Sequence, residues 1–430
     1  MVRDAYGLPV TAASPAALAA YDRAVDGFLG WDARALDLFR AATAEDPDLA
    51  LAHAGAGVAL FLEERFDEAR EAVTTARTAA AAQTPRERGH VEALALLVSG
   101  KPADAEAAMR EHLAAYPRDL VVLQRLYFIW FWQGRFPEML ALTARHAPHF
   151  GGDSFMPGLH AFALEEAGRC DEAVRVSLGA LRRNPADAWA VHAFAHAAYE
   201  MAAFDTGLSR LPAAIHPCQH LGYFRNHLLW HLALMHFSRG DYERALRLSR
   251  AVFERAPSSI AGDLHDSISL LWRLALSGID VAGRWAPFAA IARERLTRLG
   301  LSFHVVHVAM ALVGGGDWLS AERQLALLRE RAPRDRTGLL TSVVVPMVDA
   351  VQAFGRGEYG RVIERIEPIR DRIVELGGSR AQRDVFHDTL LEACFRAGDM
   401  DRARRLLAER LARRPDHQWR RRRATLGVPA

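Results

Sequence analysis

The stretch SRGDYERALR at residues 238–247 combines the end of one helical pattern, a turn containing Gly240, and the start of a second helical pattern. Four further stretches have a similar order, with a glycine or a charged pair at the turn, and each is expected to join two antiparallel helices. They are ERFDEAREA at 64–72, AGRCDEAVR at 167–175, GGGDWLSAER at 314–323 and RAGDMDRARR at 396–405. The recurring turn therefore predicts a chain of helical hairpins.

An alanine and a proline recur at a fixed separation, which sets the phase of these hairpins. A small residue is needed where two paired helices cross closely, and proline is tolerated only between helices. Twelve residues separate the two in five places, namely Ala105 and Pro117, Ala173 and Pro185, Ala245 and Pro257, Ala321 and Pro333, and Ala403 and Pro415. This spacing is typical of tetratricopeptide units of roughly 34 residues.

The predicted fold class is all-α, a right-handed α-α superhelix of about ten to twelve helix pairs of the tetratricopeptide type. One solenoid is expected over residues 1–414, with helices from about Pro15 onward and a basic C-terminal tail at 415–430 that ends frayed and solvated. The Val-rich run at 341–350 is interpreted as buried helix. Less regular insertions are expected at 143–156, 203–224, 278–300 and 333–340.

Composition excludes several classes of function. Half of the residues are apolar, a quarter are charged and the net charge is only +2, so nucleic acid is not an expected partner. The N-terminus lacks an apolar signal segment and no stretch reaches the length of a membrane span, so a membrane is not expected either. The three cysteines lie far apart, which predicts a reducing, cytoplasmic location.

The 18 histidines are the informative feature, because a repeat scaffold has no need of them. The helix DAWAVHAFAHAAYEM places His192, His196 and Glu200 at successive i, i+4 steps, and therefore on one helix face. The repeat phase starts this helix near Ala188, so the three residues take its fifth, ninth and thirteenth positions. Those positions are expected to line the concave surface of the solenoid.

Neighbouring repeats carry further polar residues. The helix RNHLLWHLALMHF supplies His227 and His231 at i, i+4, and GDLHDSISLLWRL supplies Asp263 and Asp266 at i, i+3. Stacked repeats would bring the helix of His192 and His196 beside the helix of His227 and His231, and the later helices extend a His- and Asp-rich wall within residues 187–391. Later members of the wall are His307, Arg383 and Asp384.

Such residues suit two kinds of chemistry. Imidazoles and carboxylates are ordinary ligands of zinc, iron or manganese, and the expected metal ligands are His192, His196, His227 and His231. Alternatively, a histidine oriented by a carboxylate acts as general acid or base. The adjacent glutamate of the His-Glu-x-x-His protease motif is absent. His265, His304 and His387 are interpreted as structural, hydrogen-bonded core residues.

With these residues identified, the sequence resembles the tetratricopeptide repeat protein 38 family over most of its length. The resemblance rests on YGLPVTAAS, NPADAWAVHAFAHAAYEM, HLLWHLALMHFSRGDYERAL, GDLHDSISLLWRL and LGGSRAQRDVFHDTLL. It implies a right-handed superhelix closed over a central cavity. Residues that match the family pattern are His192, His196, Glu200, His227, His231, Asp263, Asp266, His307, Arg383 and Asp384.

The sequence thus predicts an inward-facing pocket that binds a small molecule and catalyses hydrolytic or acid–base chemistry, with or without a divalent metal such as zinc. The expected catalytic residues are His192, His196, Glu200, His227, His231, Asp263, Asp266 and Asp384, and the expected ligand-binding residues are His307 and Arg383. The rival hypothesis is a groove that captures a partner protein or peptide without turnover. A pure scaffold would instead bury the histidine faces between helices.

Overall fold

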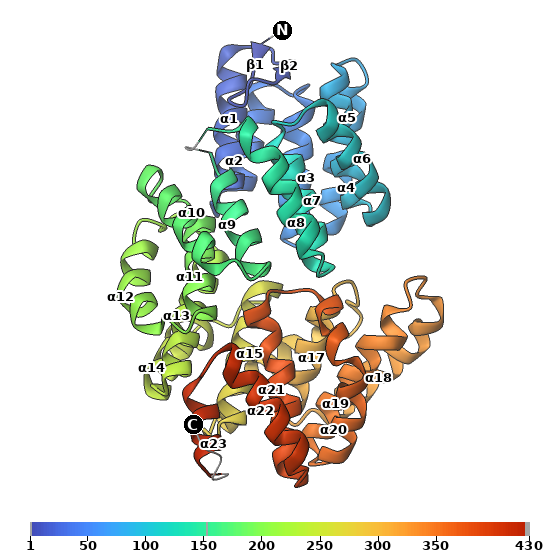
Figure 1. Ribbon diagram of the computed structural model, residues 1–430. Helices are drawn as coiled ribbons and strands as arrows, with labels where there is room; N and C mark the ends of the chain where they lie inside the picture. The colour runs from blue at the N-terminus through green and yellow to red at the C-terminus, as the bar shows by residue number, and fades with distance from the viewer. Residues whose placement is uncertain (1, 152–153, 426–430) are drawn as a thin grey trace. The chain divides into compact units, whose positions relative to one another are not determined.

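The computed structural model describes residues 2–151 and 154–425, and within these the chain is helical apart from one short hairpin (Figure 1). Strands β1 (Val2–Arg3) and β2 (Pro9–Val10) pair antiparallel. The all-α prediction is confirmed. The helices are α1 (Pro15–Leu29), α2 (Ala35–Glu45), α3 (Ala50–Leu62), α4 (Phe66–Ala80), α5 (Pro85–Val98), α6 (Pro102–Ala115), α7 (Leu120–Trp132), α8 (Phe136–His146), α9 (Met156–Glu166), α10 (Cys170–Arg183), α11 (Ala188–Glu200), α12 (Phe204–Ile215), α13 (Tyr223–Arg239), α14 (Tyr242–Ser249), α15 (Ala261–Leu276), α16 (Ala286–Glu294), α17 (Ser302–Gly314), α18 (Trp318–Arg331), α19 (Val345–Gly355), α20 (Tyr359–Ile366), α21 (Arg380–Ala397), α22 (Met400–Arg413) and α23 (His417–Thr425).

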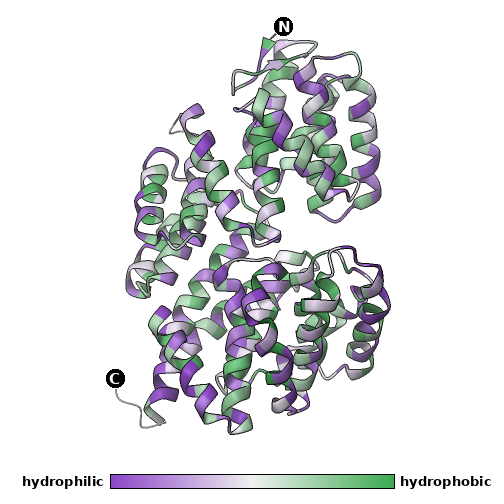
Figure 2. Cartoon of the chain, turned by 45° about the vertical axis from the view of Figure 1, so that its right-hand side comes forward, coloured by the Kyte–Doolittle hydropathy of each residue, from purple (hydrophilic) through white to green (hydrophobic). Residues whose placement is uncertain are grey.

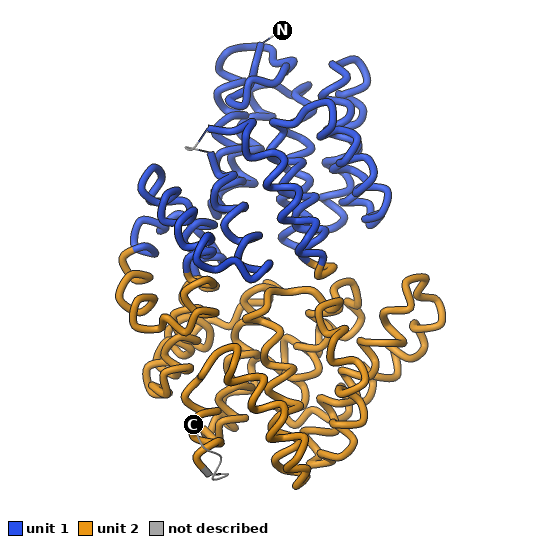
Figure 3. Tube along the Cα trace, viewed as in Figure 1, with its two compact units in different colours: residues 1–131, 135–194, 214–225 blue, residues 132–134, 195–213, 226–430 orange. Residues whose placement is uncertain are grey.

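Two compact units make up the chain, and each is described by itself (Figure 3). The first unit comprises residues 1–131, 135–194 and 214–225. The second unit comprises residues 132–134, 195–213 and 226–430. The division falls inside α11, between Phe194 and Ala195, so this helix contributes to both units.

Consecutive helices pack as hairpins in both units, as a tetratricopeptide-like helical repeat requires. The pairs α1 with α2, α3 with α4, α5 with α6 and α9 with α10 lie in the first unit, and α17 with α18, α19 with α20 and α21 with α22 in the second. Hydrophobic and hydrophilic residues both occur along the individual helices, as amphipathic packing demands (Figure 2).

The predicted small residue of the repeat is buried wherever it was expected. Ala105, Ala173, Ala245, Ala321 and Ala403 are all completely buried, because the partner helix crosses too closely for a larger side chain. In the connecting turns the chain adopts positive φ, at Gly168, Gly240, Gly316 and Gly398. Glycine is suited to these positions because it has no Cβ to clash.

Helix starts follow from local capping. Thr84 and Glu87 form a capping box at α5, and Ser379 and Gln382 form another at α21. The Val-rich run predicted to be helix forms one turn of π-helix at Leu340–Val344 that continues directly into α19.

Two of the expected insertions, 203–224 and 278–300, contain the helices α12 of 12 residues and α16 of 9 residues. The structure differs from the sequence-based prediction at the C-terminus. The tail expected to be frayed from residue 415 contains α23, with Trp419 only 2% exposed. Apolar burial of this ring orders the segment. Residues 152–153 of the first insertion and 426–430 of the tail lie outside the described residues.

None of the described helices combines the length and the apolar character that a membrane span requires.

Candidate functional site

Helices α13 and α15 bring His227, His231 and Asp266 of the second unit together. His227 and His231 lie one turn apart on the same face of α13, and Asp266 faces them from α15. Nδ1 of His227 lies 2.7 Å from Oδ2 of Asp266, and Nε2 of His227 lies 3.2 Å from Nε2 of His231. The two helices thus place two imidazoles and a carboxylate within hydrogen-bond distance of one another.

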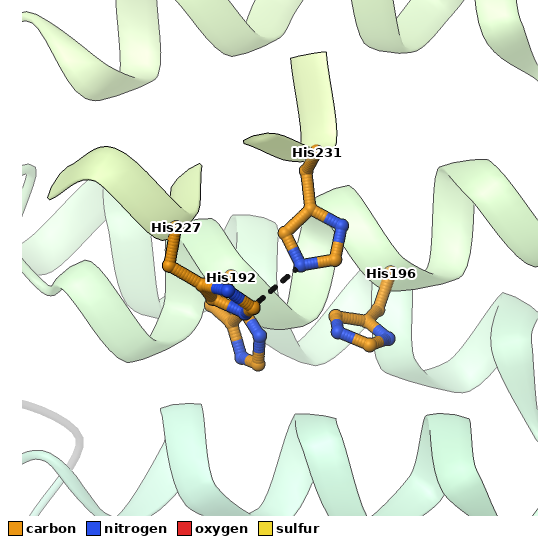
Figure 4. A group of neighbouring side chains, drawn as sticks. All are labelled: His192, His196, His227 and His231. Atoms are coloured by element: carbon orange, nitrogen blue, oxygen red, sulfur yellow. Dashed lines mark hydrogen bonds between the residues drawn. The ribbon is translucent and has the colours of Figure 1, made fainter. Parts of the chain in front are cut away.

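His196 joins this group from the second-unit part of α11. Its ring centroid lies 4.3 Å from that of His231, with the two planes 62° apart. One ring nitrogen from each of His196, His227 and His231 lies within 4.8 Å of the other two. Figure 4 draws these three side chains, with the contact between His227 and His231 dashed. The three form what we call the histidine site.

His192 lies one turn before His196 on α11, on the first-unit side of the division. Within the first unit its ring contacts three aromatic rings, with centroid distances of 4.8 Å to Phe162, 4.6 Å to Trp189 and 5.4 Å to Phe224. The side chain is drawn with the others in Figure 4. Its participation in the histidine site stays a prediction.

Burial controls the protonation of the site. His231 is completely buried, and burial lowers the pKa of its imidazole well below the ordinary value, with the neighbouring His196 and His227 adding to the effect. His231 is therefore neutral near pH 7, as a metal ligand or a base must be. The carboxylate of Asp266 accepts a hydrogen bond from Nδ1–H of His227, so Nε2 is the ring nitrogen of His227 that faces His231.

Asp263 lies one turn before Asp266 on α15. Its Oδ1 accepts a hydrogen bond of 3.1 Å from the side-chain amide of Asn226, the residue that precedes His227. Burial raises the pKa of Asp263 to about 6. A second carboxyl group thus lies on the α13-facing side of α15, and Asn226 is a partner that the sequence analysis did not identify.

Glu200 and Asp384 have arginine partners. Both bond the guanidinium of Arg414, with Nη1 of Arg414 2.7 Å from Oε1 of Glu200. Burial favours protonation of Asp384, but Arg413, Arg414 and Arg410 outweigh it and hold the pKa of this carboxyl well below its usual range. These two predicted catalytic acids therefore neutralise buried arginine charge.

The two residues predicted to bind a ligand also have protein partners. Arg383 donates from Nη1 to the carbonyl of Gly378. His307 donates from Nδ1 to the carbonyl of Phe303 at 2.8 Å, and burial lowers its pKa to about 3. Ligand binding by Arg383 and His307 stays a prediction.

The histidines interpreted as structural include a hydrogen-bonded chain. Arg295 donates from Nε to Nε2 of His304 at 2.6 Å, and Nδ1 of His304 lies 2.7 Å from Nε2 of His265. Because an arginine side chain has no acceptor, it fixes His304 with its proton on Nδ1. This chain satisfies buried polar atoms, as the structural interpretation expects.

A second histidine and carboxylate group occurs in the first unit and was not predicted. Nδ1 of His90 and Nε2 of His112 lie 2.8 and 2.9 Å from the same oxygen of Asp119, and Nη2 of Arg86 lies 3.1 Å from it. The permanent charge of Arg86 opposes a metal cation there. Asp4, Tyr21 and Arg86 border an adjacent cavity of about 10 Å³, which has room for a water molecule only.

No family model matches the chain. A solved structure titled "Structure of Naa15/Naa10 bound to HypK-THB" aligns with 94% of this chain and 64% of that chain, at 13% identity and a TM-score of 0.25. The chain therefore spans less than two thirds of the length of that protein. A similarity at this level supports no inference about fold or function, and the tetratricopeptide-like character rests on the hairpins and their buried alanines.

Proposed function

We propose that this helical-repeat protein binds one divalent transition metal, with zinc as the best fit, through His196, His227 and His231. The observation that carries the proposal is that the Nε2 atoms of His227 and His231 lie 3.2 Å apart, while the carboxylate of Asp266 bonds the other ring nitrogen of His227. Two nitrogen ligands that each lie about 2.05 Å from a tetrahedral zinc are about 3.3 Å apart. The spacing therefore suits a shared metal.

The carboxylate partner supports the same assignment. Metal-binding histidines usually donate their second ring N–H to a carboxylate or carbonyl, which fixes the tautomer and makes the ligand nitrogen more basic. Asp266 has this relation to His227. The neutral state of His231 near pH 7 also favours coordination, since a protonated imidazole cannot bind a metal.

Three histidine ligands would leave one position open for water or substrate, as in hydrolytic zinc sites. We therefore propose a small-molecule ligand and hydrolytic chemistry, with Asp263 as the second carboxyl group on the same side of α15. Membership of the tetratricopeptide repeat protein 38 family belongs to this proposal and is supported by the quoted sequence segments. A cytoplasmic location belongs to it as well and is supported by the three widely separated cysteines.

The test is the metal content of untagged protein, purified without chelator and incubated with zinc, measured by mass spectrometry. We expect about one zinc per chain in the parent and loss of it in the double variant His227→Ala, His231→Ala. His236→Ala is the matched control, because His236 lies on α13 beyond the site, with Nδ1 3.5 Å from Asp241. A parent without metal, or equal zinc in all three proteins, would sink the proposal.

The second candidate is a pure assembly scaffold. The complete burial of His196 and His231 favours it, because such a scaffold would bury its histidine faces between helices. On this alternative the double variant loses stability, but the parent holds no metal. The same metal measurement therefore separates the two candidates.

A further inference from the structure

Arg414 is a charged side chain with no solvent exposure, located between α22 and α23. Its Nη1 donates to Oε1 of Glu200 at 2.7 Å, its Nη2 to Asp384, and its Nε to Oδ1 of Asp416 at 3.1 Å. The guanidinium also lies 3.7 Å from the centroid of the Tyr199 ring. A buried arginine needs such complete pairing, because its charge cannot be removed by deprotonation.

Two of these partners are the last two residues of α11. Glu200 follows His196 by one helical turn, so Arg414 is bound to the end of the helix that carries one proposed metal ligand. Rotation or fraying of that last turn would break the ion pair and the ring contact together.

The residues after Arg414 contact the ends of the other two site helices. The ring of His417 lies so close to Gly240, just after α13, that a Cβ there would collide with it. The side chain of Gln418 accepts a hydrogen bond from the hydroxyl of Ser277, just after α15. Trp419 is buried. The C-terminal ends of the helices that carry His196, His227, His231 and Asp266 are thus all held by residues 414–419.

We propose that residues 414–419 form a clamp that fixes the relative placement of α11, α13 and α15, and that Arg414 is its positioning residue. The consequence for metal binding rests on the proposed function, whereas the clamping of α11 does not. Metal coordination requires ligand atoms to be placed to within a few tenths of an ångström. A clamp remote from the ligands would therefore control affinity without contacting the metal.

The experiment compares Arg414→Gln with Arg86→Gln, a matched loss of a buried arginine. Arg86 lies on α5 in the first unit, with Nη2 3.1 Å from both Asp4 and Asp119, so its removal also breaks buried ion pairs, but none of them involves α11 or residues 414–419. Two quantities are measured for each protein: the amide hydrogen exchange of residues 195–200, and the affinity and visible absorption spectrum of bound cobalt(II).

We expect Arg414→Gln to raise exchange in residues 195–200 about tenfold or more. Cobalt(II) affinity should fall by about 10–100-fold with a changed spectrum. Arg86→Gln should lower stability while both readouts stay close to the parent. Equal exchange in the two variants, or parent-like exchange in Arg414→Gln, would overturn the clamp.

Glu200→Ala is the second variant, in case Arg414→Gln does not fold. It removes the partner of Arg414 that lies on α11, while Asp384 and Asp416 still pair with Arg414. The same rise in exchange over residues 195–200 is expected, and its absence counts against the clamp. If the parent binds no cobalt(II), the proposed function fails and hydrogen exchange alone decides the clamp.

Discussion

Nδ1 of His227 lies 2.7 Å from Oδ2 of Asp266, and this contact joins α13 to α15. The side chain of Asp266 is almost fully buried, and that of His227 is 12% exposed. A buried carboxylate in this position fixes the orientation and the tautomer of the His227 ring, so that its Nε2 faces His231. The relationship makes Asp266 the residue whose replacement most directly tests the organisation of the site.

We expect Asp266→Asn to lower zinc affinity by about 10–100-fold while leaving one site per chain, because the amide cannot accept the Nδ1–H of His227 with the strength of a carboxylate. Competition with a coloured chelator measures the change. Asp263→Asn is the control and should keep parent-like zinc affinity, because Asp263 bonds Asn226 and not one of the proposed ligands. Parent-like affinity in Asp266→Asn would contradict an orienting role.

The pH dependence of stability can be predicted from His307. Its pKa is lowered to about 3 in the folded protein, so the unfolded chain binds the extra proton first as the pH falls. The stability that neutral His307 provides is complete above its unfolded pKa of about 6.5 and is lost as the pH falls toward 3. Between pH 6.5 and 5 the loss is about 2 kcal/mol.

The measurement is urea unfolding of the parent and His307→Gln at both pH values. The stability advantage of the parent over this variant should shrink by about 2 kcal/mol at the lower pH, because glutamine does not titrate. The exposed His149 is the control, and His149→Gln should show no such change. A constant difference between the parent and His307→Gln would show that His307 does not titrate as proposed.

Asp119 should be essential for the stability of the first unit. Its carboxylate accepts from His90 and His112 and lies 3.1 Å from Arg86, and the charged and hydrogen-bonding neighbours keep its pKa well below the usual range despite burial. We expect Asp119→Asn to lower the free energy of unfolding by about 3–5 kcal/mol, because Arg86 loses one of its two buried carboxylate partners and keeps only Asp4.

Urea denaturation checks this value, with the exposed Glu111→Gln as a control expected to change stability by about 0.5 kcal/mol or less. Zinc content should be unchanged in Asp119→Asn, since the proposed ligands lie in the second unit. Loss of zinc with intact stability would instead point to a metal function for the Asp119 group.

The stability cost of replacing Trp419 tests whether the C-terminal segment is an ordered helix or a frayed tail. The ring is 2% exposed, so Trp419→Ala should cost about 3–5 kcal/mol through the cavity left in the second unit. Arg420→Ala, one residue later on the exposed side of α23, should cost about 0.5 kcal/mol or less. Thermal and urea unfolding give both numbers, and equal small effects would mean that the segment from 415 is frayed.

Much of the fold follows from local sequence patterns. The turn glycines and the buried alanines at a fixed distance from a proline act within one hairpin, so spacing alone identifies them. The pairs His192 with His196 and His227 with His231 are also local, because a helix puts residues four apart on one face. The stacking of adjacent repeats predicted that the two histidine helices lie side by side, but the contact of His227 with Asp266 came only from the structure.

The sequence by itself determined the helical hairpins, their phase and the helix faces that carry histidine and aspartate. Tertiary structure alone decided the partners of those faces. Glu200 and Asp384 meet at Arg414, which is 214 residues from Glu200 along the chain, and no local spacing encodes such a contact. The physical reason is that an unpaired charge is costly to bury, so a buried charged group needs an oppositely charged or hydrogen-bonding partner. The packing of remote helices decides which residue that partner is.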